Sequence, residues 1–507
     1  MQPAPLDPPR TFRQSLAHLG PGVLLASSIV GSGELIATTT VGAEAGFQLL
    51  WLIVLGCAIK VAAQLEIGRT TLSWGRTPLA ACERVPGPRL AGRGWIYWAW
   101  VAMTTLILVQ QGGILMGVAQ TLAAGMPLTA AGRAWNRAED EAAAARIEAA
   151  AAVRVGDQAR ADASRARMAA LDEEAGRHAS RSDDSLWAVV VAVVTAGLLA
   201  RGRYLVIERV SLVLVGTFTV VTLAAVALLQ RDPAWAISWP ELRSGLVPSL
   251  PHAVNGRSPL TTALATFGII GVGAAELMFY PYWCLEKGYG RAVGPRDASP
   301  GWADRARCWM RVMQLDAWTS MLVYTTVTVA FYLLGAATLG RLGLRPAGGD
   351  MVRSLGAMYA PAFGNWAAGL FLTGAFAVLY STLFAAADGN ARIITDGLIV
   401  AGLVPDDDAS RASWSRRIAV AWPLAALALA LAIREPVGMV LASGAAQSVM
   451  LAVLGGVVLY FRHGEPDHDL LPSRVSDVLL WCSAAGLIAV GLWTGWQKVA
   501  GFLLGRV

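Results

Sequence analysis

The sequence predicts an all-α polytopic membrane protein with about eleven transmembrane helices, of which the first and the sixth are broken near the middle. Hydrophobic residues make up 55% of the 507 residues and charged residues only 15%, and the mean hydropathy is +0.51. These values lie outside the range of ordinary soluble proteins. Apolar runs close to the roughly 20 residues needed to cross a bilayer recur along the whole chain. We therefore expect residues 1–507 to form one transmembrane domain whose main partner is the lipid bilayer.

Eleven apolar segments are long enough, or nearly long enough, to span the bilayer, and the fourth and the ninth are short. The predicted spans are residues 21–41, 47–67, 98–122, 186–200, 205–229, 260–284, 313–339, 363–387, 418–433, 437–460 and 478–492. The first eighteen residues are polar and proline-rich and lack the apolar core of a signal peptide. We therefore expect the first span to remain in the mature protein.

Arginine residues in the short loops indicate the orientation. The loops after the second, fourth and sixth spans carry arginines within residues 69–93, 201–203 and 291–311, and loops of this kind belong in the cytoplasm. With Arg10 and Arg13 also inside, the N-terminus is predicted to be cytoplasmic in the plasma (inner) membrane. The arginine bias accounts for most of the net charge of +6, and we expect no nucleic-acid partner because no nucleic-acid-binding module is recognisable.

One segment between the third and fourth spans differs from the rest of the chain. Residues 134–177 are rich in alanine, glutamate and arginine, which favour helix, and contain no apolar stripe long enough to cross a membrane. We assign residues 131–185 to a soluble helical insertion on the outer side, with a bend near Gly156 and Asp157. We interpret it as a solvated insert with ion pairs along its helices; an arm that docks a partner is the alternative.

Two spans contain the same interruption, a pair of glycines followed by a carboxylate. The interrupting residues are Gly31, Gly33 and Glu34 in the first span and Gly271, Gly273 and Glu276 in the sixth. Where a helix unwinds inside the bilayer, free carbonyl groups end its first half and free N–H groups begin its second half, so the break can bind an ion. An intramembrane carboxylate costs roughly 3 kcal/mol or more and indicates a functional site. Alternatively, the glycines serve close helix packing and each glutamate pairs with an arginine.

The two breaks supply the predicted metal site. Glu34 would lie at the positive end of its second half-helix, and the sixth span repeats this arrangement with Glu276. Hard oxygen ligands of this kind suit Mg²⁺, Ca²⁺ or Mn²⁺. The predicted metal ligands are the side chains of Glu34 and Glu276, the carbonyl groups of Val30, Gly31 and Ala275, and the side chain of Gln447.

Gln447 belongs to a set of polar residues within the spans that must face protein or water. The other members are Lys60, Gln64, Gln110 and Gln111. For this set, packing or hydrogen bonding is the simpler interpretation, and metal binding is the alternative.

The spacing of the breaks also predicts the architecture. Broken helices at matching places in two halves indicate an inverted-repeat transporter with its site near the midplane of the membrane. Five spans separate the two breaks, so the repeats cover approximately residues 19–230 and 258–462, and the odd number of spans inverts the second repeat.

Several short motifs resemble the NRAMP (natural resistance-associated macrophage protein) family. They read Gly-Pro-Gly at 20–22, Gly-Ala-Glu-Ala-Gly-Phe at 42–47, Leu-Leu-Trp at 49–51, Gly-Arg-Tyr-Leu-Val-Ile-Glu at 202–208 and Gly-Ile-Ile-Gly at 268–271. The resemblance covers most of the chain. It implies the LeuT fold with eleven or twelve spans and proton-coupled transport of divalent metals.

The sequence departs from the family at the metal site itself. Where the family has Asp-Pro-Gly-Asn, residues 31–34 read Gly-Ser-Gly-Glu, and where it has Met-Pro-His, residues 275–277 read Ala-Glu-Leu. The soft thioether of the family is thus lost, which favours Mg²⁺ or Mn²⁺ over Fe²⁺. All five histidines lie outside the predicted spans, so the proton route implied by the resemblance lacks its usual carrier.

These observations favour a secondary-active transporter of divalent metal cations that works by alternating access, with the cation as substrate and no resident cofactor. A symporter of an organic cation or amine is the alternative, because aromatic side chains beside Glu276 are able to cage an ammonium group; they are Phe279, Tyr280, Tyr282 and Trp283. A third possibility is a non-transporting sensor that displays the insertion. No enzyme is expected, because no nucleophile, base and orienting group converge. We expect the protein to be monomeric.

Overall fold

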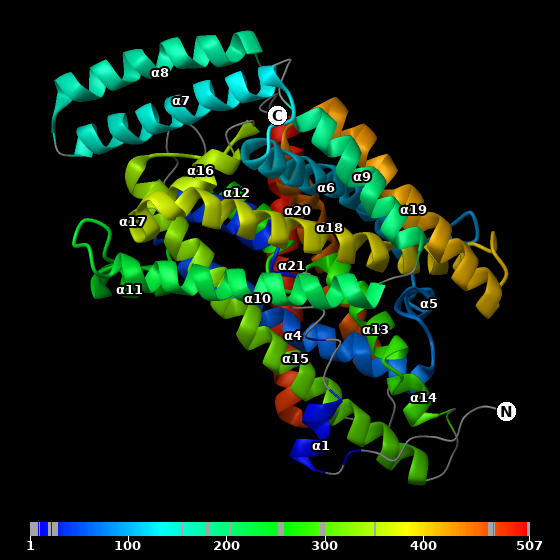
Figure 1. Ribbon diagram of the computed structural model, residues 1–507. Coiled ribbons are helices and arrows are strands. Elements are labelled where there is room, and N and C mark those ends of the chain that lie inside the picture. The colour runs from blue at the N-terminus through cyan, green and yellow to red at the C-terminus, as the bar shows by residue number, and fades with distance from the viewer. Residues whose placement is uncertain are drawn as a thin grey trace.

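The computed structural model describes residues 9, 11–18, 22, 29–154, 156–178, 183–201, 204–251, 258–294, 296, 300–348, 351–464, 470 and 472–503. Within these ranges the chain is almost entirely helical, and its strands are a hairpin of two residues each, β1 (Arg89–Leu90) and β2 (Arg93–Gly94). The long helices pack into one bundle, from which a pair of helices projects at one end (Figure 1).

Seven helices of the described chain are long and apolar enough to cross a membrane. They are α4 (Leu50–Trp74), α6 (Trp95–Gly125), α15 (Pro300–Leu334) with its π-helical extension η3 (Gly335–Gly340), α18 (Ala367–Val400), α19 (Asp408–Ile433), α20 (Pro436–His463) and α21 (Arg474–Leu503). The helices α9 (Asp184–Ala200) and α10 (Tyr204–Leu229) and two broken spans complete the set. Large apolar side chains such as Val193, Val220 and Trp496 are exposed on the outside of the bundle, as expected where lipid is the solvent. The predicted all-α polytopic class is therefore confirmed.

The first span is interrupted where the sequence predicts. Val30 and Gly31 form a turn that is followed by the π-helix η1 (Gly33–Thr38) and by α3 (Thr39–Ala45). Residues 23–28, in the first half of this span, lie outside the described residues. A side chain at Gly31 would overlap the Thr382 hydroxyl of α18. The glycine therefore lets the break lie directly against α18.

The sixth span consists of two half-helices, α12 (Pro259–Phe267) and α13 (Ala274–Glu286), which confirms the second predicted break. Residues 268–273 between them are not helical. Gly271 has φ +55°, in the left-handed region, and an added Cβ would lie 3.0 Å from the Tyr324 ring and 3.2 Å from the Cα of Cys57. Conformation and space thus both require glycine here. A proline, Pro281, lies inside α13.

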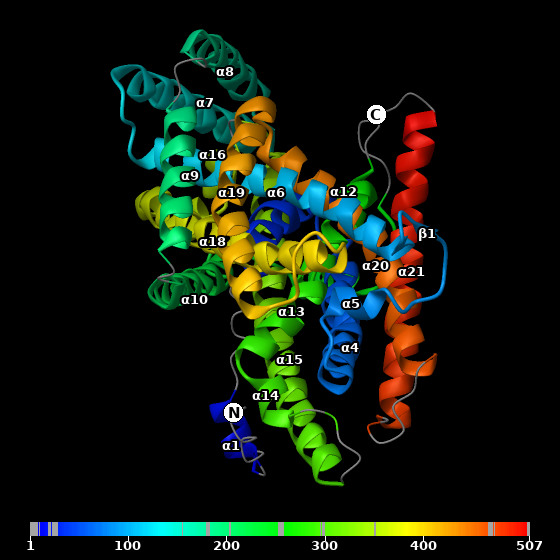
Figure 2. The same cartoon turned by 90° about the vertical axis from the view of Figure 1, so that its right-hand side faces the viewer.

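The two breaks lie at the centre of the bundle. Helix α20 contacts η1, α12 and α13, while α4 contacts both halves of the sixth span and α15 contacts η1 and α3. The last helix, α21, lies beside α20 at the edge of the molecule (Figure 2). Residues far apart in the sequence therefore form the surroundings of both breaks.

Some helices extend beyond the apolar runs that predicted them. Helix α18 continues to Val400, although its apolar run ends at residue 387, and α19 begins at Asp408 rather than at residue 418. The added turns of α18 carry Asp388 and Arg392, which form an ion pair, and Arg392 also pairs with Glu286 of α13. Hydropathy predicts the apolar part of such a helix and misses its ion-paired end.

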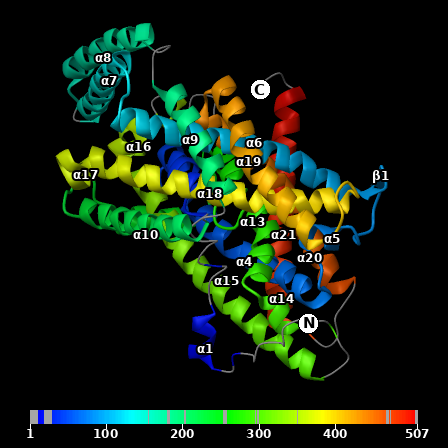
Figure 3. The same cartoon turned by 45° about the vertical axis from the view of Figure 1, so that its right-hand side comes forward.

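Short helices connect the spans or lie next to them. They are α1 (Phe12–Ala17), α5 (Pro78–Cys82), α11 (Trp239–Leu246), α14 (Tyr289–Val293), α16 (Met351–Ala357), α17 (Ala360–Phe363) and the 3-10 turn η5 (Gly364–Trp366). Helices α1 and α14 lie at the end of the molecule opposite to α7 and α8, the helices of the projecting pair (Figure 3).

The projecting pair is an antiparallel hairpin of α7 (Ala130–Arg154) and α8 (Gln158–His178). Its turn contains Gly156, with φ +77°. The two helices pack along buried alanines, including Ala142, Ala145 and Ala161. The sequence analysis does not predict this packing, because it treats alanine as a helix-forming residue and not as an apolar contact residue.

Helix α7 is fixed to the bundle through α16. Arg353 of α16 donates to Asp140 Oδ1 at 2.6 Å, and its guanidinium group lies 4.9 Å from the centre of the Trp135 ring. The Asn136 amide donates to the Ala123 carbonyl of α6 at 2.7 Å. The hairpin therefore has a defined attachment, while its side of the membrane and its limits as a separate domain stay predictions.

Candidate functional site

Glu34 connects the two breaks. Its side chain is fully buried, and its Oε2 accepts from the Gly31 N–H at 3.3 Å. Its Oε1 accepts from the Gly271 N–H at 3.4 Å and from the Thr328 hydroxyl of α15 at 3.2 Å. Both carboxylate oxygens therefore have donors, and one side chain links the first span, the sixth span and α15.

Glu276 lies in the first turn of α13, and its environment is different. Its Oε2 is buried and has no hydrogen-bond partner among the described residues. This oxygen faces Gly273, where an added Cβ would overlap it and would lie 2.9 Å from the Gly268 carbonyl oxygen and 3.0 Å from Gln447 Oε1. Three oxygens from different segments thus converge where Gly273 has no side chain.

The network around Gln447 directs its amide oxygen toward the sixth-span break. Gln447 Nε2 donates to Gln110 Oε1 of α6 at 2.9 Å and to the Ser443 hydroxyl at 3.3 Å. Its Oε1 accepts from the Ala275 N–H at 3.2 Å. The side chain therefore has a fixed orientation, with one acceptor lone pair left for another ligand.

Lys60 of α4 is fully buried beside the same break. Its ammonium group donates to the carbonyls of Phe267 and Ile270, the latter at 2.7 Å, and lies 4.6 Å from the centre of the Phe267 ring. The charges of Glu34 and Glu276 both act on it. The sequence places Lys60 among polar residues that must face protein, but it does not show that the ammonium group lies at the break.

The predicted ligands fall into two groups. Glu34 lies with Gly31 and Val30 at the first break, and Glu276 lies with Ala275 and Gln447 at the sixth. The Gly31 carbonyl accepts from the Leu35 N–H at 2.9 Å, so the helix uses one of its lone pairs. In the described part of the chain, no three His, Cys, Asp or Glu side chains form a group able to hold a metal ion. A cation here would therefore depend on two carboxylates together with carbonyl and amide oxygens.

Sequence reasoning missed the Gly268 carbonyl as a potential ligand. The signal was present, because Gly268 begins the Gly-Ile-Ile-Gly motif at the end of α12. An added Cβ at Gly268 would overlap the Gly444 carbonyl of α20, so this glycine allows α12 and α20 to approach closely. That approach also brings the Gly268 carbonyl near Gln447.

The aromatic residues after Glu276 make contacts away from its carboxylate. The Tyr280 hydroxyl donates to Asp316 of α15 at 3.0 Å, and the Tyr282 hydroxyl donates to Asp396 of α18 at 2.7 Å. Asp316 also accepts from the Gly22 N–H. The tyrosine hydroxyls thus connect α13 with its neighbours, and this arrangement gives no support to an aromatic cage around Glu276.

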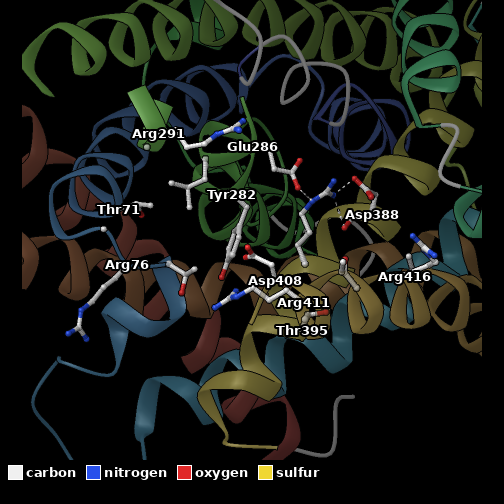
Figure 4. A pocket seen from close by; sticks show the side chains of 18 of the residues that line it. Thr71, Arg76, Tyr282, Glu286, Arg291, Asp388, Thr395, Asp408, Arg411 and Arg416 are labelled. Carbon is white, nitrogen blue, oxygen red and sulfur yellow. Dashed lines mark hydrogen bonds and ion pairs between the residues drawn. The ribbon is translucent and has the colours of Figure 1, made fainter. Parts of the chain in front are cut away.

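A charged cavity of about 1280 Å³ lies beyond the other end of α13, between the ends of α4, α13, α18 and α19 (Figure 4). Arg392 donates to Glu286 and to Asp388 within it. None of the predicted metal ligands lines this cavity. It is therefore separate from the breaks and is connected to them through α13.

Asp396 joins several segments beside the charged cavity. It is buried and accepts from the hydroxyls of Thr77 and Tyr282, both at 2.7 Å, and from Arg411 at 3.1 Å. The donors come from the loop after α4, from α13 and from α19. The Asp396 carboxylate therefore joins these three segments to α18 through hydrogen bonds.

A bundle of spanning helices with two central broken helices defines a class of membrane transporters whose site lies between the breaks. The sequence profile of the family described as natural resistance-associated macrophage protein-like (Nramp) matches residues 178–497, and the chain belongs to this family. It is a metal-ion transporter and not an enzyme. The matched range contains the sixth-span break but not the first.

Solved structures share the fold of this chain, and a curated relative is similar to it over most of its length. Two structures of the manganese transporter of Eremococcus coleocola, one of a mutant and one in complex with an aromatic bis-isothiourea compound, have TM-scores of 0.56 and 0.53. Both are 16% identical and cover 99% of this chain and 91% of that chain. An uncharacterized protein of Pasteurella multocida (strain Pm70) is 23% identical over 498 residues, 94% of this chain and 91% of that protein. The predicted LeuT-type fold with two inverted five-helix repeats is confirmed.

Proposed function

We propose that this protein carries a divalent metal cation across the plasma (inner) membrane by alternating access, with Mg²⁺ or Mn²⁺ favoured over Fe²⁺. Membership of the Nramp family and the shared fold with a protein described as a manganese transporter support a divalent metal. The oxygen ligands at the breaks support a hard ion, because Mg²⁺ and Mn²⁺ favour carboxylate and carbonyl groups.

The observation that carries this proposal is the buried Oε2 of Glu276, which has no donor among the described residues and lies beside two further oxygens. A buried carboxylate oxygen without a partner is costly unless a cation pairs with it. The proposed ligands are Glu276, Gln447 and the carbonyls of Gly268 and Ala275 from the sixth-span side, and Glu34 with the carbonyls of Val30 and Gly31 from the first-span side.

Contacts at one end of α13 support alternating access. Tyr280 and Tyr282 tie α13 to α15 and α18, and the charged cavity lies next to these ties. We assign the cavity to the cytoplasmic side, because the arginine-rich loops that follow α4 and α13 lie there. Release of the ion toward the cytoplasm requires the hydrogen bonds of Tyr280 and Tyr282 to break. Contacts at the other end of the bundle form at the same time.

Uptake into proteoliposomes tests the proposal. Purified protein is assayed with Mg²⁺, Mn²⁺, Ca²⁺, Fe²⁺ and methylammonium, alongside a Glu276→Gln variant. We expect uptake of Mg²⁺ or Mn²⁺ that depends on Glu276. Glu148→Gln, a matched change at an exposed site on α7, should behave like the parent protein. Uptake of methylammonium without any divalent cation would instead support the organic-cation alternative.

The orientation has a separate test. A cysteine introduced at Ala150 in the hairpin should react with a membrane-impermeant reagent in intact cells, because we place the hairpin outside and the N-terminus in the cytoplasm. Protection of this cysteine would show that the orientation or the number of spans is wrong.

A further inference from the structure

The end of α12 has an unusual way of satisfying its backbone. The last four carbonyls of a helix have no donors within the helix. In α12, Leu264 O accepts from the Ser448 hydroxyl at 2.6 Å, Ala265 O from the Gly268 N–H at 3.1 Å, and Thr266 O from two N–H groups of the break. The fourth carbonyl, Phe267 O, accepts from the Lys60 ammonium group. A charged side chain from another span thus completes the end of this half-helix.

The surroundings of the ammonium group are those of a small bound cation. Two carbonyl oxygens, of Phe267 and Ile270, contact it directly, and the face of the Phe267 ring lies on one side. The negative end of the helix dipole points at it, and Glu34 and Glu276 supply further negative charge. In transporters with broken helices, unwound carbonyls and half-helix C-terminal ends coordinate coupling ions.

We propose that Lys60 is a tethered cation: its ammonium group occupies a monovalent-cation site at the broken end of α12 and replaces a free co-ion. The charge is held by the chain, so no Na⁺ or K⁺ has to bind there. A neutral donor would satisfy the two carbonyls without offsetting the two carboxylates, which is the physical reason for a lysine at this position. The part of this inference that concerns transport rests on the proposed function, because it states which monovalent ions the uptake of the divalent cation requires.

The first experiment measures folding and does not depend on transport. Lys60→Ala removes the ammonium group and leaves room for a small ion, so we expect a lower melting temperature that Na⁺, K⁺, ammonium or methylammonium raises again in a saturable way. Choline, a cation too large for the space, should have no effect. The parent protein should respond to none of these ions beyond the effect of ionic strength.

Two variants separate the charge from the packing. Ile53→Ala removes a fully buried side chain about two turns earlier on α4, so it lowers the melting temperature without recovery by cations. Lys60→Met fills the space without a charge, so it should be destabilised and should gain little from added ions. Lys60→Arg, which keeps the charge, should be closer to the parent than Lys60→Met.

The second experiment measures uptake of the divalent cation. The parent protein should work equally well, within about twofold, in choline and in Na⁺ or K⁺. Lys60→Ala should depend on a small monovalent cation, with at least about a tenfold difference between its presence and absence. If no divalent cation is carried by the parent but the folding of Lys60→Ala recovers, the tethered cation stands and the proposed function fails.

Several results would overturn the proposal. They are a Lys60→Met protein as stable and active as the parent, equal recovery of Ile53→Ala by cations, and a parent protein that itself requires Na⁺ or K⁺. A Lys60→Ala protein that cannot be recovered even when it is produced and purified in methylammonium would count equally against it.

Discussion

The two broken helices carry the same pattern of glycines and a carboxylate, yet the two carboxylates have different surroundings. Three donors hold Glu34, and one of them belongs to the other break. Glu276 has an oxygen without a donor in the described chain, beside the carbonyl of Gly268 and the amide oxygen of Gln447. A shared sequence pattern therefore does not imply shared surroundings: Glu34 connects the two breaks, whereas Glu276 has one carboxylate oxygen that the proposed function assigns to the cation.

The largest effect is expected at Glu276. Glu276→Gln keeps the shape of the side chain but removes its charge, and it should abolish divalent-cation uptake or weaken cation binding at least tenfold, about 1.4 kcal/mol. The melting temperature should fall less than in Glu34→Gln, because the affected oxygen has no donor and the Lys60 ammonium group keeps Glu34 as its second carboxylate. Titration calorimetry and thermal unfolding of the same samples measure both quantities. Unchanged cation affinity would remove Glu276 from the site.

Glu34→Gln should combine a loss of uptake with a loss of stability. A glutamine amide cannot accept from all three donors, and its NH₂ group would face an N–H or hydroxyl donor, which costs about 1–3 kcal/mol. Thermal unfolding in the absence of metal should therefore show a lower melting temperature for Glu34→Gln than for Glu276→Gln. Equal melting temperatures would contradict the difference between the two breaks.

The two changes also test whether the breaks form one site. For cation binding, the double variant should add little to either single variant, because both residues act on the same ion. Additive losses of affinity would indicate two independent sites.

Gln447→Leu is expected to have a smaller effect on binding. It removes one oxygen ligand and leaves the Ala275 N–H without its acceptor, so cation affinity should fall by roughly three- to tenfold, about 1 kcal/mol. Gln120→Leu is a matched control, because the buried amide of Gln120 donates to the Gly348 carbonyl, which belongs to neither break, and its loss should leave affinity unchanged. An equal effect of both changes would mean that Gln447 acts only through packing.

The smallest effect on cation uptake is expected from removal of the hairpin. Replacing residues 134–177 by a short flexible linker leaves both breaks intact. It also removes Asp140, Trp135 and Asn136, which contact the nearly buried Arg353 and the end of α6, so stability should fall by about 1–3 kcal/mol without a change at the breaks. Expression level and divalent-cation uptake should stay close to those of the parent. Loss of either would show that the hairpin supports the bundle or binds a required partner.

The sequence was sufficient to predict the membrane class, the two breaks and the inverted repeats, because each depends on a local pattern of apolar runs, glycines and carboxylates. The different surroundings of Glu34 and Glu276 depend on contacts across the bundle, such as those with Thr328 and Gln447, which no local pattern contains. The partners of Lys60 are hidden for the same reason: the carbonyls that it binds are more than 200 residues away. A polar residue inside a span thus indicates a partner but does not identify it.

Pro281 gives α13 a mechanical property that its length alone does not suggest. It cannot donate to the Leu277 carbonyl, so one hydrogen bond of the helix is missing between the turn that carries Glu276 and the turns that end at the charged cavity. The part of α13 after Pro281 is thus able to bend relative to the part before it, which carries Glu276. Pro281→Ala, which restores the bond, should slow cation release in stopped-flow measurements without changing equilibrium affinity; an unchanged release rate would rule out a role for this bending. A slower release with unchanged affinity would place release and binding in two segments of one helix.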